Sequence, residues 1–125
     1  MKEWSRKWKG SKIPKKQRKY VHKAPLHVRG SFLSAHLTKE LRQKYHTRSL
    51  RLRKGDRVKI VRGSFKGKQG KVERVDTKKL RIYIEGAVMT KRDGTKTSYP
   101  LHASNVLITD IETGDKRRLS EGKPL

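Results

Sequence analysis

Hydrophobic and polar residues alternate in two short stretches of the second half of the chain. In residues 56–61, Val58 and Ile60 alternate with the charged residues Arg57 and Lys59, which is typical of a half-buried strand. Residues 80–85 show the clearest alternation and predict a second strand with one buried face. The residues predicted to face inward are Leu80, Ile82 and Ile84, and those predicted to face outward are Arg81, Tyr83 and Glu85.

Further short runs predict additional strands. One covers residues 71–75, where Val72 and Val75 would lie on opposite faces, so we expect a β-bulge or a sharp coil between them. The dipeptide Asp93-Gly94 is a strong hairpin signal. The remaining predicted elements are strands at 88–91, 96–99 and 105–111 and a helical turn at 101–104. Short, regularly spaced strands with glycine turns predict a small, mainly β barrel.

Residues 26–45 show helical spacing instead. Their apolar residues recur at four-residue steps, at Leu33, Leu37, Leu41 and Tyr45. We expect one or two short helices, the last near residues 39–45, with Ser34 or Thr38 as an N-cap residue. Their single apolar stripe should pack on the β domain that follows.

Charge changes the interpretation of the first half. The chain has a formal net charge of +24, from 35 Lys and Arg against 11 Asp and Glu. Residues 1–54 hold 18 of these cations and only two of the acids. Such an excess makes a compact fold repel itself, and a polyanion such as nucleic acid or an anionic membrane surface relieves that repulsion.

Residues 1–24 contain too few apolar residues to offset the entropy of ordering. We therefore predict a basic arm that is disordered on its own, apart from a helical turn beginning at Pro14. Trp4 and Trp8 are four residues apart, so a helix would place them on one face. Two roles remain open for them, namely stacking on bases and docking on a neighbouring protein surface.

The two strand-like runs at 56–61 and 71–75 flank a loop rich in glycine and lysine. Its predicted loop-forming residues are Gly63, Gly67 and Gly70, and its cations are Arg62, Lys66, Lys68 and Lys71. Glycine takes positive φ without steric cost, so this spacing allows a tight reversal. Accessible backbone surrounded by cations suits a phosphate-bearing partner. The alternative is a solvated hairpin whose lysines only maintain solubility.

Several other chemistries find no support in the sequence. The loop is not a P-loop, because Gly63 and Gly67 are one residue too close and Gln69 follows Lys68. No cysteine is present, and the five histidines have no paired-ligand spacing, so we predict no metal site. No catalytic triad or carboxylate pair is indicated, so we predict no enzyme, no cofactor and no small-molecule substrate. No apolar run approaches the ~20 residues of a membrane span, and the first residues lack a signal-peptide core, so we predict neither membrane insertion nor secretion.

The stretch KGDRVKIVRGSFKGKQGKV resembles the KOW motif, a β-hairpin of several ribosomal and transcription-elongation proteins. Its flanks resemble a narrower group. APLHVR followed by LTKELRQKYHTRSLRLRKGD, and IYIEGAVMTKRDGTK followed by HASNVLIT, are similar to the archaeal and eukaryotic branch of the large-subunit ribosomal protein twenty-four family. The resemblance covers roughly residues 20–111. The arm with its two tryptophans and the short C-terminal tail depart from the pattern.

This resemblance implies a Src-homology-three-like barrel that binds large-subunit rRNA directly near its 5′ end. It also implies an early role in subunit assembly, a place near the exit of the peptide tunnel in the cytoplasmic ribosome, and ribosomal proteins as neighbours. A KOW-type transcription-elongation or other RNA-binding module is the alternative. We expect a basic extension with short helices at 1–50, a KOW barrel at 51–113 and a polar tail at 114–125. The candidate RNA-binding residues are Lys9, Lys12, Lys15, Lys16, Arg18, Lys19, Arg29, Arg53, Arg62, Lys66, Lys68 and Lys71.

Overall fold

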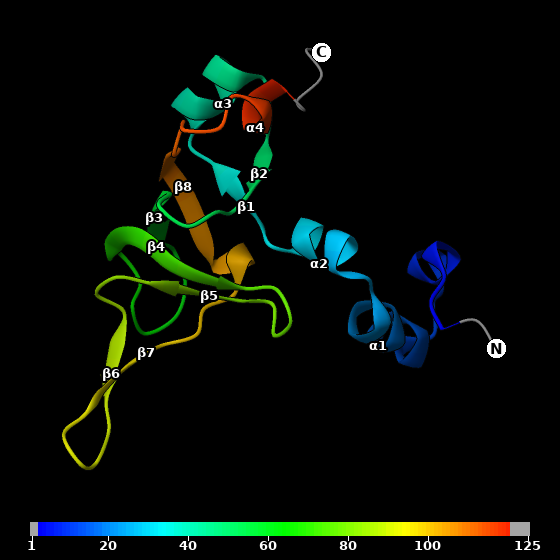
Figure 1. The fold of residues 1–125 in the computed structure, drawn as a ribbon, viewed down its shortest axis with the longest axis horizontal. Coiled ribbons are helices and arrows are strands. Elements are labelled where there is room, and N and C mark those ends of the chain that lie inside the picture. Colours follow the sequence, from blue (N-terminus) through cyan, green and yellow to red (C-terminus); the bar gives the residue numbers. More distant parts are fainter. Residues whose placement is uncertain (1–2, 121–125) are drawn as a thin grey trace.

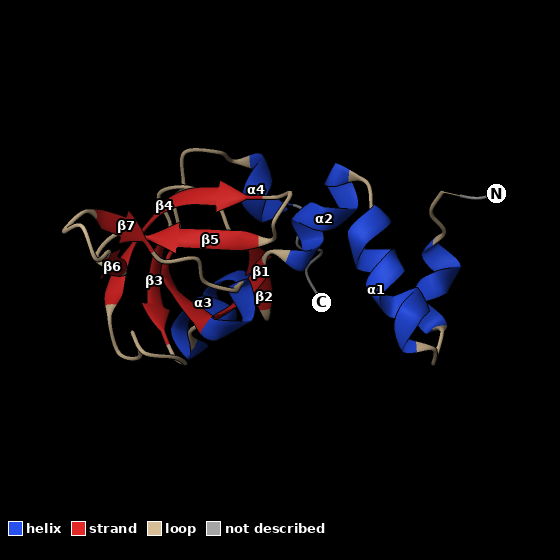
Figure 2. Ribbon diagram, turned by 90° about the horizontal axis from the view of Figure 1, so that it is seen from below, coloured by secondary structure: helices blue, strands red, loops and turns tan. Residues whose placement is uncertain are grey.

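The computed structural model describes residues 3–120 and combines a β-sheet core with a helical N-terminus (Figures 1 and 2). The helices are α1 (Pro14–Lys23), α2 (Leu26–Phe32), α3 (Lys39–Tyr45) and α4 (Arg117–Ser120), with 3-10 helices at Arg6–Gly10 and Ala103–Asn105. The strands are β1 (Ser34–Leu37), β2 (Ser49–Arg51), β3 (Arg57–Ile60), β4 (Gln69–Asp76), β5 (Arg81–Ile84), β6 (Val88–Thr90), β7 (Lys96–Ser98) and β8 (Val106–Asp110).

Six of these strands form one sheet in the order β2-β1-β8-β3-β4-β5, and β6 pairs with β7 in a separate two-stranded sheet. Within residues 3–120 the six-stranded sheet does not close, because β2 and β5 remain its edge strands. The predicted closed barrel is therefore not found, and the fold is a mixture of helix and sheet. The sheet remains open at β5, because this edge strand has no second strand paired along it in the described part of the chain. Ile82 of β5 forms only a single isolated bridge with Leu101.

The hydrophobic core draws on both halves of the chain. Leu33 and Leu37 have no exposed surface, and they join Ile82 and Ile108, which are equally buried, in one cluster. The boundary expected at residue 50 falls inside β2, and β1 pairs in parallel with β8. The sheet thus begins before the KOW-like stretch.

The helical spacing of Leu33 and Leu37 was misleading. Leu33 directly precedes strand β1, and Leu37 is its last residue. Within the strand Ala35 and Leu37 are buried, whereas His36 is exposed. The period-two pattern Leu33, Ala35, Leu37 fits a strand as well as the period-four pattern fits a helix, and pairing with β2 and β8 decides between them. The helix predicted at 39–45 is confirmed as α3.

The break in regular pairing predicted between Val72 and Val75 is confirmed, since the register between β4 and β5 shifts between Val72 and Arg74. Tyr83, predicted to face outward, does not join the core cluster that contains Ile82 and Ile84. It is nevertheless only 9% exposed, and the Arg74 guanidinium lies over its ring at 4.1 Å from the centroid. Ile82 and Ile84 are buried as expected, whereas Leu80 precedes the strand and is half-buried with a φ of 55°.

The hairpin predicted around Asp93-Gly94 is confirmed as β6 and β7, which project from the rest of the molecule (Figure 1). The helical turn and the last strand also form, each within two residues of the expected start.

The N-terminal segment, predicted as a basic arm, forms two short helices that are joined to the next helix by aromatic contacts. Trp4 stacks on Tyr20 of α1 at 5.3 Å between ring centroids, and its indole N–H donates to the Tyr20 carbonyl over 3.0 Å. Tyr20 in turn lies 5.7 Å from Phe32 of α2, so a small aromatic cluster substitutes for a larger core. Trp8 lies apart beneath the Lys19 ammonium. Trp4 therefore docks on protein, and the two tryptophans do not share a helix face.

The C-terminal segment, predicted as a polar tail, supplies a buried charge. Arg118 is 5% exposed and forms a salt bridge with the fully buried Asp56. The Asp56 carboxylate also accepts hydrogen bonds from the backbone N–H groups of Arg53 and Glu112. These bonds attach α4 to the start of β3. The last part of the predicted tail, residues 121–125, lies outside the described residues.

Candidate nucleic-acid interface

The loop between β3 and β4 is held in shape by its own backbone. The Gly67 N–H donates to the Ile60 carbonyl over 2.8 Å, and the Lys66 N–H donates to the Gly63 carbonyl over 3.2 Å. Gly63 and Gly67 have φ values of 95° and 90°, and a Cβ at either would meet nothing within 4 Å. Conformation rather than space requires glycine at these two positions.

Gly70 has a different role from the one predicted. It lies in β4 and its φ is not positive, but a Cβ there would come within 2.5 Å of the Glu85 carbonyl oxygen. The residue permits β4 and the end of β5 to approach each other closely.

The loop cations are accessible. Arg62, Lys66 and Lys68 of the loop and Lys71, which lies in β4, are all exposed. Within residues 3–120 none of them takes part in a salt bridge. The Lys68 ammonium lies 5.0 Å from the centroid of Phe65, whose ring contacts Tyr99 at 5.2 Å. The aromatic pair anchors the loop to the rest of the protein and leaves its cations facing solvent.

A second group of cations lies on the first two N-terminal helices and on the short connection between them. The residues predicted there are all exposed, namely Lys9, Lys12, Lys15, Lys16, Arg18 and Lys19. Lys15 and Lys19 are one turn apart on α1, which has no acid in its first turn. This helix extends from the side of the sheet in both views (Figures 1 and 2). Cations on a projecting helix are suited to contact phosphates.

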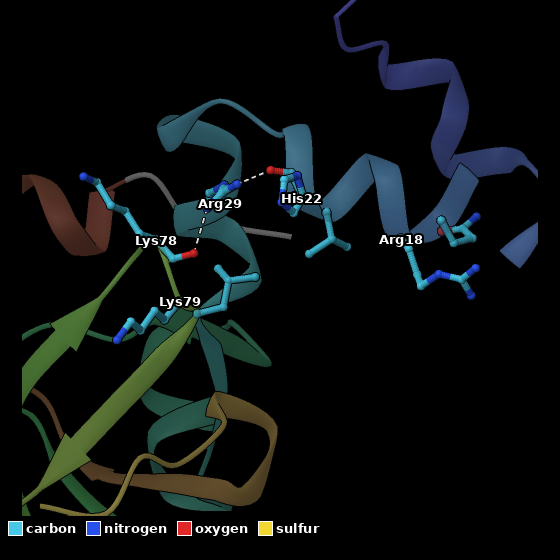
Figure 3. Close-up of a pocket in the computed structure, with 8 residues that line it drawn as sticks. Arg18, His22, Arg29, Lys78 and Lys79 are labelled. Carbon is cyan, nitrogen blue, oxygen red and sulfur yellow. Dashed lines mark hydrogen bonds between the residues drawn. The ribbon is translucent and has the colours of Figure 1, made fainter. Parts of the chain in front are cut away.

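Arg29 does not resemble the other candidates. Its guanidinium donates to the carbonyls of His22 and Lys78, the latter over 2.7 Å (Figure 3), and also to the carbonyl of Ala24. The side chain therefore joins the end of α1 to the turn between β4 and β5. Each of its nitrogens already has an acceptor, so Arg29 is a structural clamp in this conformation.

Arg53 is exposed but paired. Its guanidinium forms a salt bridge of 2.7 Å with Asp115, and the two side chains are 47% and 46% exposed. The hydrogen bond from Arg53, followed by one from the Arg117 N–H, lowers the pKa of Asp115 below its ordinary value. Pairs this exposed are worth little, so a phosphate can compete for Arg53.

A cavity of about 620 Å³ lies beside the Arg29 clamp, between α1, α2 and the β4–β5 turn (Figure 3). The described residues that line it include the cations Arg18, Arg29, Lys78 and Lys79 and no acid. The Asp76 carboxylate accepts the backbone N–H groups of both lysines over 3.0 Å. The bond from Lys79 is the main cause that lowers the pKa of Asp76. Lys78 and Lys79 are not among the residues that the sequence analysis predicted to bind RNA.

Other kinds of site receive no support from the described residues. Within residues 3–120 no three His, Cys, Asp or Glu side chains come together as metal ligands. No helix in this part of the chain is long and apolar enough to cross a membrane.

A sheet with an open, glycine-shaped cationic loop and a basic helical extension defines a protein suited to bind a polyanion. The chain matches the family model that describes the ribosomal proteins L26 of eukaryotes and their archaeal L24 counterparts, over residues 11–121. It is also 48% identical over 108 residues to the large ribosomal subunit protein uL24 of Methanosphaera stadtmanae, covering 86% of this chain and 92% of that protein. The chain belongs to this family of large-subunit ribosomal proteins.

Proposed function

We propose that this protein is a structural, non-enzymatic constituent of the large ribosomal subunit in the cytoplasm and that it binds the large rRNA directly. The observation that carries the proposal is the pair of exposed cation groups, one on the β3–β4 loop and the adjoining part of β4 and the other within residues 9–19. Membership of the ribosomal family supports rRNA as the polyanion. From the resemblance we further propose an early role in assembly, a position near the tunnel exit and contacts with neighbouring ribosomal proteins.

The two cation groups would position the protein through the RNA backbone. Lysine and arginine contacts to phosphate carry no sequence information, so recognition would depend on the shape of the RNA. We also propose that β3, β4, β5 and β8 with the β6–β7 hairpin correspond to a Src-homology-three-like barrel that is open in this chain. The basic extension and this unit would then bind adjacent rRNA segments.

The alternative, a transcription-elongation module, shares the KOW hairpin but not the flanks. The family match extends over residues 11–121, far beyond the hairpin, and therefore favours the ribosome. Sedimentation of a cell lysate tests the choice. We expect the tagged protein to migrate with the large subunit at low salt and to be absent from purified RNA polymerase. Association with polymerase and absence from ribosomes would contradict the proposal.

A further inference from the structure

A second cavity, of about 390 Å³, adjoins the glycine loop. It is formed by loop residues 62–65, by the first residue of β5 and by residues between 99 and 105. These segments are distant in the sequence, and the contact between Phe65 and Tyr99 brings them together. The cavity is thus a product of the tertiary fold.

The charged part of its lining consists of Arg62 and Arg81, both exposed. No acid is found among the described residues that line the cavity. The Arg81 side chain makes one long hydrogen bond of 3.4 Å to the Leu80 carbonyl, and the Arg62 side chain makes no hydrogen bond or ion pair with any residue from 3 to 120. Guanidinium donors without a carboxylate partner are available to a phosphate.

The remaining lining suits a nucleobase. Phe65 and Tyr99 are half-buried rings set 51° apart at the wall, and aromatic rings of this kind stack on unpaired bases. Ser64, Ser104 and Asn105 add hydroxyl and amide groups that can bond the edge of a base. Cationic, aromatic and amide groups therefore converge on one concave site.

We propose that this cavity holds a single unpaired nucleotide of the rRNA, with its phosphate on Arg62 and Arg81 and its base against Tyr99 and Phe65. The inference rests on the proposed rRNA binding and adds to it a contact with a base. Double-stranded RNA is excluded as the occupant, because its bases are stacked and paired within the helix.

The test compares two probes of equal charge on the full-length protein, namely a uridine pentanucleotide and an abasic ribose-phosphate pentamer. Fluorescence anisotropy should show about tenfold tighter binding of the base-bearing probe, as stacking of one base predicts. Tyr99→Leu and Phe65→Leu should each remove most of this preference. Tyr45→Leu is the matched control, since Tyr45 packs against the core elsewhere and does not line the cavity. Melting temperatures verify that each variant is folded.

Equal affinity of the natural protein for both probes, or a preference retained by both cavity variants, would overturn the inference.

A second measurement needs no variant. Ultraviolet crosslinking in isolated large subunits, mapped by mass spectrometry, should attach a nucleotide within residues 62–65 or 99–105, and its absence there would overturn the inference too. Tight, salt-dependent rRNA binding without base preference would reject only the proposal that the cavity holds a nucleotide. Failure to bind large-subunit rRNA rejects the proposed function itself.

Discussion

At the scale of single residues, the glycines of the KOW-like stretch meet two different physical demands. Gly67 needs a positive φ in open space, whereas Gly70 needs the absence of a Cβ against the Glu85 carbonyl. A sequence motif does not separate these demands, because both select glycine.

We expect Gly67→Ala to lower the free energy of unfolding by about 1–2 kcal/mol through backbone strain. Gly70→Ala should cost about 1–3 kcal/mol, because β4 and β5 must move apart to admit the Cβ. Urea denaturation measures both. Gly10→Ala is the control, since its φ is not positive and a Cβ there meets nothing within 4 Å. Equal stability of all three variants would show that neither demand operates.

The buried pair Asp56–Arg118 gives a second prediction for single residues. Asp56→Ala should cost about 3–5 kcal/mol, because it leaves a buried guanidinium without its carboxylate partner. Arg118→Ala should cost less, because Asp56 keeps its two backbone N–H donors. Thermal unfolding of both variants and of the exposed control Lys116→Ala measures the differences. If Arg118→Ala and Lys116→Ala had equal melting temperatures, the attachment of α4 by the Asp56–Arg118 pair would not contribute to stability.

At the scale of elements, the position of α1 depends on few interactions. The Arg29 guanidinium bridges the end of α1 to the β4–β5 turn, and one aromatic cluster joins α1 to α2. We expect Arg29→Ala to release α1 while the sheet stays folded. Hydrogen exchange should accelerate in residues 14–23 and stay unchanged in β3, β4 and β8.

The exposed arginine of the same helix is the matched control for this experiment. Arg18→Ala removes an equal charge without touching the clamp, and it should leave exchange in α1 unchanged. Unaltered exchange in Arg29→Ala as well would show that the aromatic cluster alone holds the helix.

At the scale of the whole molecule, stability and charge are unevenly distributed. Residues 1–24 hold ten Lys and Arg and one acid, yet Tyr20 and Ala24 are their only buried hydrophobic residues among those described. The core cluster begins at Leu33. Much of the charge therefore lies outside the part of the chain that stabilises the fold.

Deletion of residues 1–24 should change the melting temperature of the sheet little and weaken rRNA binding strongly. The slope of log affinity against log salt should become shallower by roughly 0.7–0.9 for each phosphate that the shortened protein no longer neutralises. Filter binding between roughly 50 and 200 mM salt measures this slope. Replacement of Lys12, Lys15, Lys16 and Lys19 by glutamine is the control that removes charge and keeps the helix. Unfolding of the sheet on deletion would show that the N-terminal helices belong to the core.

The sequence by itself determined the local features of this protein. Alternation indicated β3 and most of β5, Asp93-Gly94 indicated the β6–β7 hairpin, and the exposed loop cations follow from the glycine and lysine spacing. These features depend on interactions between near neighbours, so a local pattern is sufficient to predict them.

Only the tertiary structure decided the features that depend on distant partners. Leu33 and Leu37 lie beside and at the end of a strand because β2 and β8 pair with β1. Arg118, in the predicted tail, forms a buried salt bridge because the fold brings it to Asp56, which is 62 positions away in the sequence. Arg29 became a clamp because the Lys78 carbonyl lies within its reach. The pairing of Phe65 with Tyr99, which shapes the second cavity, has the same origin. Local periodicity cannot specify such interactions, because their free energy depends on which segments the whole fold brings together.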